Sequence, residues 1–230
     1  MLTPSSETPS LTTSGENMER TPHCHRAAAR EFVNAAELTT LQVNPKNGAK
    51  SIAFRRPIRV RMGGRDRDTA LRAPFGGPKS FDPTKVDRLS FSVCVAPDSP
   101  EAQYADLLDN KAKSLLKARL GEFIPGTNPA RIDEDWKPIK KEPRSEDYWP
   151  TISVKVQATG ANPTRIWIEG QQVKAEDVPW SHCRVAIVCQ ARSLWVQPKM
   201  YGVSLEARDI VVYPEYNNNP DELDSEEDEE

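Results

Sequence analysis

The 230-residue sequence has little of what large cores and membrane spans require. Only 37% of its residues are hydrophobic, below the roughly 45–50% usual for a globular domain, and 20 residues are proline. No apolar run approaches the about 18 residues that cross a bilayer, and the N-terminus has no apolar signal region. We therefore expect one loop-rich intracellular domain of about 150–200 residues with flexible ends and no membrane contact.

Residues that carry catalysis or bind metals are also scarce. There are three histidines and four scattered cysteines, and neither G-x-x-x-x-G-K-[ST] nor G-x-S-x-G occurs. The His-Cys-His run at 23–25 has no second ligand pair at zinc spacing. Asp66 and Asp68 would suit a metal-dependent nuclease, but the arginines beside them favour loop ion pairs. We predict no metal, no cofactor and no enzymatic activity.

What the sequence does have is a division of charge. The net charge is −3, yet nine of the 34 acidic residues lie beyond Pro214. Residues 1–214 therefore carry 31 basic and 25 acidic side chains. A block of like charge such as residues 221–230 is expected to be extended, and such tails are often interaction segments. The composition indicates a basic body with an acidic tail.

The basic charge concentrates on one strand-like segment, Ser51 to Met62. Its even positions are apolar except Arg56, and its odd positions include several arginines. This alternation predicts a strand with a core face and a basic face. Pro57 predicts a bulge or an edge within it, because proline cannot donate to a ladder. A solvated outer face is the alternative, but the one-signed charge continues into a glycine-rich loop and favours phosphate contact.

Most of the remaining pattern is also β. Alternating apolar runs predict strands over residues 88–96, 152–158, 165–168, 183–190 and 203–213, the last with a change of period near Arg208-Asp209. Ser99-Pro100 begins an amphipathic helix that should end near Gly121. Residues 125–150 are rich in proline and charge and predict a long surface loop. We predict a mainly β fold, an OB-like five-stranded barrel with an inserted amphipathic helix and disordered termini.

Aromatic residues beside cations complete the predicted site. Trp167 lies beside Arg165, and Trp195 precedes Lys199 and Tyr201. Rings that stack on bases and cations that follow the backbone bind single strands with little sequence preference, although such rings often pack in the core instead. The predicted nucleic-acid-binding residues are Arg55, Arg59, Arg61, Arg65, Arg67, Arg165, Trp167, Arg184, Trp195, Lys199 and Tyr201.

The segment Met200-Tyr201-Gly202-Val203-Ser204-Leu205, continuing to Pro214, resembles the closing strand of the OB-fold single-stranded-DNA-binding replication proteins of large DNA viruses and phages. In the phage members an acidic tail follows, as residues 221–230 do here. The resemblance implies a protein that coats and protects unwound DNA during viral replication and recombination. It also implies a tail that recruits replication proteins, and a location in the host nucleus or at a viral replication site. The insertion at 125–150 departs from the family pattern.

The predicted organisation is a flexible arm over residues 1–45, an OB-like nucleic-acid-binding domain over 46–214 and a disordered acidic tail over 215–230. The expected partners are single-stranded DNA or RNA, replication proteins through the tail, and a second copy of the chain in a homo-oligomer. One alternative is a transcription or replication adaptor that acts through protein contacts. Another is a virion structural protein built as a β-sandwich.

Overall fold

The computed structural model describes residues 26–45, 48–80 and 88–215. Its helices are α1 (Arg26–Asn34), α2 (Pro100–Ala118), α3 (Leu120–Phe123) and α4 (Ala130–Glu134). The longer strands are β1 (Leu38–Val43), β2 (Lys50–Met62), β4 (Arg88–Cys94), β7 (Thr151–Gln157), β8 (Arg165–Ile168), β10 (Cys183–Gln197) and β11 (Met200–Pro214). Short strands are β3 (Leu71–Arg72), β5 (Trp136–Lys137), β6 (Lys140–Lys141) and β9 (Gln171–Val173).

The predicted mainly β class with an inserted helix is confirmed, but the sheet is larger than predicted. It has 11 strands rather than five, along the path β1-β2-β10-β11-β7-β4. Within the described residues no pairing joins β4 back to β1, so the path is open. Four of the added strands are only two or three residues long, too short to show a readable alternation.

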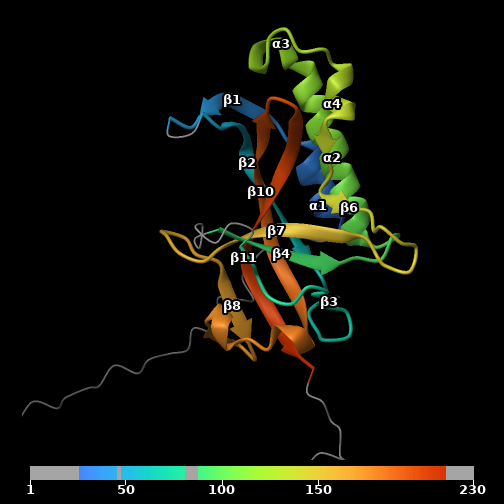
Figure 1. The fold of residues 1–230 in the computed structure, drawn as a ribbon, viewed down its shortest axis with the longest axis vertical. Helices are drawn as coiled ribbons and strands as arrows, with labels where there is room; N and C mark the ends of the chain where they lie inside the picture. Colours follow the sequence, from blue (N-terminus) through green and yellow to red (C-terminus); the bar gives the residue numbers. More distant parts are fainter. Residues whose placement is uncertain (1–25, 46–47, 81–87, 216–230) are drawn as a thin grey trace, which may run out of the picture.

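Two groups of strands enclose the core. In Figure 1 the strands β2, β10 and β11 run nearly vertically, and β4 and β7 cross in front of them. Phe91 of β4 and Ile152 of β7 are buried, as are Ile187 of β10 and Ile210 of β11. The other side of β2, β10 and β11 faces away from this core, and polar side chains can therefore lie on it.

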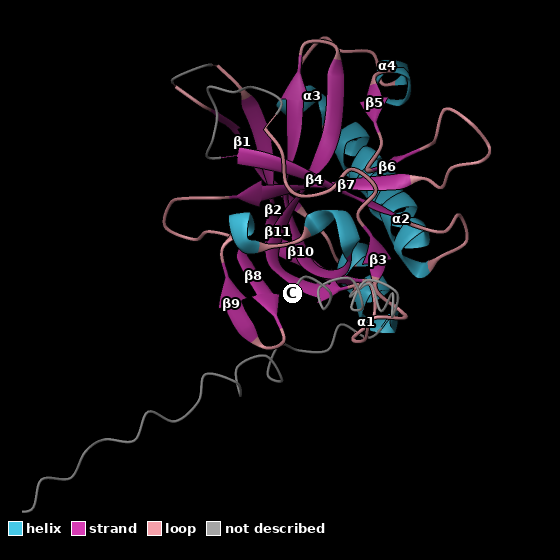
Figure 2. Ribbon diagram, turned by 60° about the horizontal axis from the view of Figure 1, so that its bottom comes forward, coloured by secondary structure: helices cyan, strands magenta, loops and turns pink. Residues whose placement is uncertain are grey.

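Helix α2 begins and packs as the sequence predicts. The Ser99 hydroxyl accepts a hydrogen bond from the Ala102 amide at 3.2 Å, and Pro100 follows at the first helical position. Leu108 and Leu116 are fully buried on one side of the helix. Figure 2 shows α1, α2 and α4 gathered along one side of the sheet.

The N-terminal and loop regions hold more structure than the sequence indicates. Residues 26–45, expected within the flexible arm, form α1 and β1, and β1 pairs with β2. The predicted surface loop at 125–150 contains α4, β5 and β6. The rest of the predicted arm and the acidic tail at 221–230 lie outside the described residues, as does the His-Cys-His run.

The change of period near Arg208-Asp209 corresponds to a bulge. Val188 of β10 pairs with Asp209, whereas the next residue, Cys189, pairs with Ala207. One extra residue on β11 shifts the alternation by one position, which keeps apolar side chains inward on both sides of the bulge. The bulge thereby directs Asp209 to the face opposite the core.

Candidate nucleic-acid interface

Strand β2 presents the predicted basic face. Ile58, Val60 and Met62 are buried, while Arg59 between them is exposed and Arg61 is half-buried. Successive side chains of a strand point to opposite faces, so Arg59 and Arg61, two positions apart, point to the same face. The basic face of β2 is therefore the side turned away from the core.

The register of the sheet extends that face over three more strands. Arg61 lies opposite Val188 of β10, Val188 lies opposite Asp209 of β11, and Asp209 lies opposite Arg165 of β8. Directly paired residues point to the same side of a sheet, so these four share one face. At about 4.8 Å between strands, the row spans roughly 14 Å. We call this side the outer face. The neighbouring row, Arg59 with Gln190, Glu206 and Lys155, lies on it as well. The polar and aromatic residues of the outer face thus include Arg59, Arg61, Arg165, Trp167, Arg184, Gln190, Glu206, Lys155, Asp209 and Tyr213.

Trp167 is held on the outer face by a carboxylate. Its indole Nε1 donates to Asp209 Oδ1 at 3.1 Å. Arg165 donates to the same carboxylate from Nε at 2.7 Å and from Nη2 at 2.9 Å. The Arg165 guanidinium carbon lies 5.7 Å from the centre of the Trp167 ring. A half-buried indole beside a guanidinium is the arrangement on which bases stack.

A second aromatic residue lies at the lower end of the face. Tyr213 of β11 pairs with Arg184 of β10, and its hydroxyl donates to the Arg65 carbonyl at 2.7 Å. Partial burial raises the pKa of Tyr213 above its ordinary value, so it stays a neutral donor. Arg61 also contacts Tyr213, which joins β2 to β11 across β10.

Glu215 sits among arginines at this end. The Arg184 Nε donates to Glu215 Oε1 at 3.0 Å, and this hydrogen bond holds the pKa of Glu215 below its ordinary value. The charges of Arg67 and Arg72 act in the same direction. Three arginines near one carboxylate make a local positive field in which an anion is favoured. Arg67 is in a loop, but its charge therefore adds to the positive potential at this end of the outer face.

Other predicted residues lie away from this cluster. The pairing of β2 with β10 shifts register between Ile58 and Ala53, which corresponds to the bulge predicted at Pro57. Arg55 lies within this shift and forms an ion pair with Glu37 at 3.1 Å. Trp195 and Lys199 lie toward the β10–β11 turn, and Lys199 is roughly 40 Å along the hairpin from Arg184. The structure contradicts the inclusion of Tyr201: the residue is 4% exposed, because its side chain packs in the hydrophobic core. A side chain that is covered in this way cannot offer a stacking surface.

Trp195 packs against the backbone of the neighbouring strand. A Cβ added to Gly202 would lie 2.6 Å from Trp195 Cζ2 and 2.9 Å from the Lys137 carbonyl oxygen. We therefore expect Gly202→Ala to destabilise the fold by about 2 kcal/mol through overpacking, as measured by chemical denaturation. Gly121→Ala is the matched control, because a Cβ there meets nothing within 4 Å. Equal stability of the two variants would contradict this packing.

Three residues of the interface were missed by sequence reasoning. Tyr213 and Asp209 belong to the closing strand, and Arg72 forms the short β3 beside Arg184. The change of period at Arg208-Asp209 could have predicted the position of Asp209, because it moves that side chain from the apolar face of the strand to the polar face. Nothing in the sequence pairs Arg72 with Arg184, which is more than a hundred positions away.

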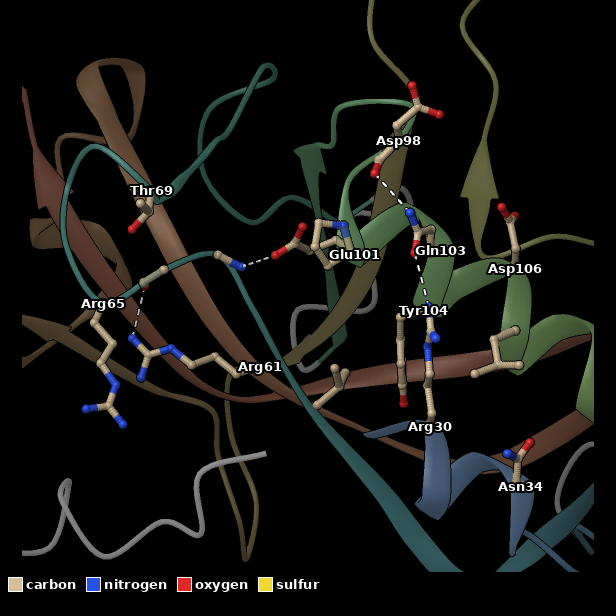
Figure 3. A pocket seen from close by; sticks show the side chains of 15 residues that line it. Arg30, Asn34, Arg61, Arg65, Thr69, Asp98, Glu101, Gln103, Tyr104 and Asp106 are labelled. Carbon is tan, nitrogen blue, oxygen red and sulfur yellow. Dashed lines mark hydrogen bonds between the residues drawn. The ribbon is translucent and has the colours of Figure 1, made fainter. Parts of the chain in front are cut away.

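A groove of about 1440 Å³ borders the outer face at β2. Figure 3 shows Arg61 directed toward Gly64, and both Arg61 and Arg65 line the groove. The opposite wall belongs to α1 and the start of α2 and carries Asp98, Glu101 and Asp106. Glu101 accepts a hydrogen bond from the Gly63 amide at 3.2 Å. The same wall also carries Arg30, so the groove is lined by three acids and by three arginines, Arg30, Arg61 and Arg65. The one-signed positive charge of the outer face therefore does not continue into the groove.

The described residues offer little for catalysis. Within residues 26–45, 48–80 and 88–215, no group of three or more His, Cys, Asp or Glu side chains is placed to hold a metal ion. Asp66 accepts hydrogen bonds from the Thr69 amide at 2.9 Å and the Thr69 hydroxyl at 2.7 Å, which lower its pKa. Asp66 therefore stabilises the turn that leads to Thr69. In the same part of the chain no helix is long and apolar enough to span a membrane.

Comparison with known proteins identifies no family, since no family model and no curated protein match the chain. Solved structures that resemble it include three of the single-stranded DNA-binding protein from bacteriophage Enc34. Its complex with ssDNA aligns with a TM-score of 0.45 and 10% identity, over 76% of this chain and 94% of that chain. A C-terminal truncation of the same phage protein aligns with a TM-score of 0.44 and 11% identity, over 77% of this chain and 95% of that chain. A third structure of that protein aligns with a TM-score of 0.43 and 10% identity, over 80% of this chain and 95% of that chain.

Proposed function

We propose that this chain binds single-stranded nucleic acid, with single-stranded DNA as the main ligand, across its outer face. The observation that carries the proposal is the convergence of Arg59, Arg61, Arg165 and Arg184 with Trp167 on one side of four neighbouring strands. The guanidinium groups of Arg59 and Arg61 can fork onto phosphate oxygens, whereas the indole of Trp167, with Arg165 beside it, supplies a stacking surface. No chemical step is part of this function.

The biological role that follows is coating. A protein that binds only the single strand lowers the free energy of that strand and removes secondary structure by mass action. Such a protein protects unwound DNA during replication and recombination, with viral DNA as the proposed setting. The acidic residues 221–230 would compete with the nucleic acid for the basic outer face and recruit replication proteins through charge complementarity.

The direct test is fluorescence anisotropy of a labelled oligo-dT of about 30 nucleotides against a duplex of equal length, over a salt series. We expect tight binding to the single strand, a steep fall of affinity with salt, and tighter binding by a chain that ends at Glu215. Ending there keeps the ion pair between Glu215 and Arg184. Equal or negligible binding to both nucleic acids would overturn the proposal.

Trp167→Ala tests the stacking part of the proposal. Loss of one base–aromatic contact should weaken oligo-dT binding by about tenfold, and the loss should persist at high salt because stacking is not screened. Trp149→Ala is the control, since Trp149 is a more exposed tryptophan, 57% exposed, in the loop before β7. Unchanged affinity of the Trp167 variant at every salt concentration would remove Trp167 from the interface.

A second candidate function is an adaptor that acts through protein contacts, and one observation favours it. Tyr148 and Trp149 are adjacent, 71% and 57% exposed, and away from the outer face. Exposed aromatic residues are enriched in protein interfaces. If oligo-dT and duplex both fail to bind, this function becomes the favoured one, and Trp149→Ala should then weaken partner binding.

A further inference from the structure

An acidic residue lies in the middle of the basic outer face. Asp209 is 9% exposed and pairs across the sheet with Val188 on one side and Arg165 on the other. A carboxylate at this place repels phosphate, so charge alone predicts that it weakens the binding of a nucleic acid. The contacts of Asp209 show whether it contributes something other than charge.

The geometry around Asp209 supplies that contribution. Both carboxylate oxygens are occupied: Oδ1 accepts from Arg165 Nε and from Trp167 Nε1, and Oδ2 accepts from Arg165 Nη2. A bidentate pair with arginine fixes the plane of the guanidinium, and the indole hydrogen bond fixes the rotation of the ring. One carboxylate therefore sets the orientation of the stacking ring and of the cation beside it.

We propose that Asp209 is a positioning residue for nucleic-acid binding, one that strengthens the binding of a polyanion although it is itself negative. This inference rests on the proposed function. Its energetic basis is preorganisation: a ring and a guanidinium already held in the bound geometry lose less conformational entropy when the ligand arrives. The binding free energy gained from a preorganised stacking surface then exceeds the electrostatic repulsion between the phosphates and one carboxylate that Arg165 partly neutralises.

The opposite predictions of charge and positioning make a sharp experiment. In Asp209→Asn one negative charge is removed and the bidentate pair is lost. We expect binding of oligo-dT at about 0.5 M salt to weaken by roughly tenfold, because stacking dominates there. We also expect the salt dependence to steepen by about 0.7 in log–log slope, because the released Arg165 can then pair with a phosphate.

Glu206→Gln is the matched control. Glu206 is on the same strand and pairs with Arg192 at 3.7 Å, but it holds no aromatic ring. Removing its charge should leave the affinity unchanged or raise it by about twofold. If Asp209→Asn raises the affinity in the same way as Glu206→Gln, the positioning role is overturned.

A double-mutant cycle with Trp167→Ala tests whether the effect passes through the ring. When Trp167 is absent, Asp209→Asn should no longer weaken binding at high salt. Additive losses in the cycle would overturn the inference.

Trp167→Phe is a second variant that keeps an aromatic ring and leaves the pair of Asp209 with Arg165 intact. Its affinity for oligo-dT should lie between those of wild type and Trp167→Ala. Binding of Trp167→Phe at the wild-type level would overturn the role of the indole hydrogen bond.

The wild-type chain separates this inference from the proposed function. If wild type binds oligo-dT and Asp209→Asn binds equally well, only the positioning role fails. If wild type does not bind the single strand in preference to duplex, the proposed function fails and the inference with it. Circular dichroism and thermal unfolding of each variant, measured beside wild type, separate a loss of binding from a loss of folding.

Discussion

Replacing Arg59 and Arg61 together with glutamine is expected to weaken oligo-dT binding by roughly 30-fold at about 0.1 M salt. Both side chains lie on the outer face of β2, opposite Gln190 and Val188 of β10. Each phosphate contact adds about 0.7 to the slope of log affinity against log salt for a single strand, so the slope should fall by about 1.4. Anisotropy titrations over a salt series measure both quantities.

Arg55→Gln is the control for that experiment. Arg55 is on the same strand and its side chain is 71% exposed, but the ion pair with Glu37 and the bulge at Pro57 set it apart from the row of Arg61. We expect less than about a twofold effect, with an unchanged slope. A double variant with the same slope as wild type would show that neither Arg59 nor Arg61 contacts phosphate.

Asp109→Ala is expected to lower the free energy of unfolding by about 3 kcal/mol. Asp109 is buried on α2 and accepts hydrogen bonds from Trp136 Nε1 at 3.0 Å and from the Ile139 amide at 2.8 Å. Each of these buried donors, left without an acceptor, costs about 1–3 kcal/mol. The three residues connect the insertion at 125–150 to the inserted helix, so this part of the chain should unfold more easily in the variant.

The same carboxyl gives a pH signature. Burial raises the pKa of Asp109 from 3.8 to about 6, and the two hydrogen bonds only partly oppose that rise. The folded state then binds a proton more readily than the unfolded chain. The resulting stabilisation is complete below a pH of about 4 and is lost as the pH rises through 6.

Denaturant unfolding of wild type and Asp109→Asn at several pH values tests this signature. The asparagine keeps one acceptor oxygen and does not titrate, so it should lose less stability than the alanine variant. As the pH falls from about 7 toward 5, the stability of wild type should increase relative to Asp109→Asn. A difference that is independent of pH would contradict the raised pKa.

The strands and the inserted helix were readable because their signals are local. Alternation over Ser51–Met62 predicted β2, and Ser99-Pro100 predicted the start of α2. The short strands β5 and β6 were not predicted. They form where a charged, proline-containing segment pairs with β11 and β7, and no alternation of its own marks them.

The aromatic residues show the same limit. Trp136, Trp149, Trp167 and Tyr201 occur in segments of similar polarity, yet the first and last are buried and the other two are not. Trp136 is buried because Asp109, on a distant helix, offers an acceptor to its indole. A sequence cannot distinguish a ring that finds such a partner from one that does not.

The sequence by itself determined which residues of each strand point away from the core, and it placed the acidic tail after a basic body. The tertiary structure alone decided which of those residues meet. Arg61, Asp209 and Arg165 share a row because β2, β10, β11 and β8 pair in one particular register, and a slip of one residue would send each side chain to the other face. The hairpin of β10 with β11 is local, but β2 pairs with β10 across more than a hundred positions and β8 pairs with β11 across more than forty, and local pattern does not record these two pairings.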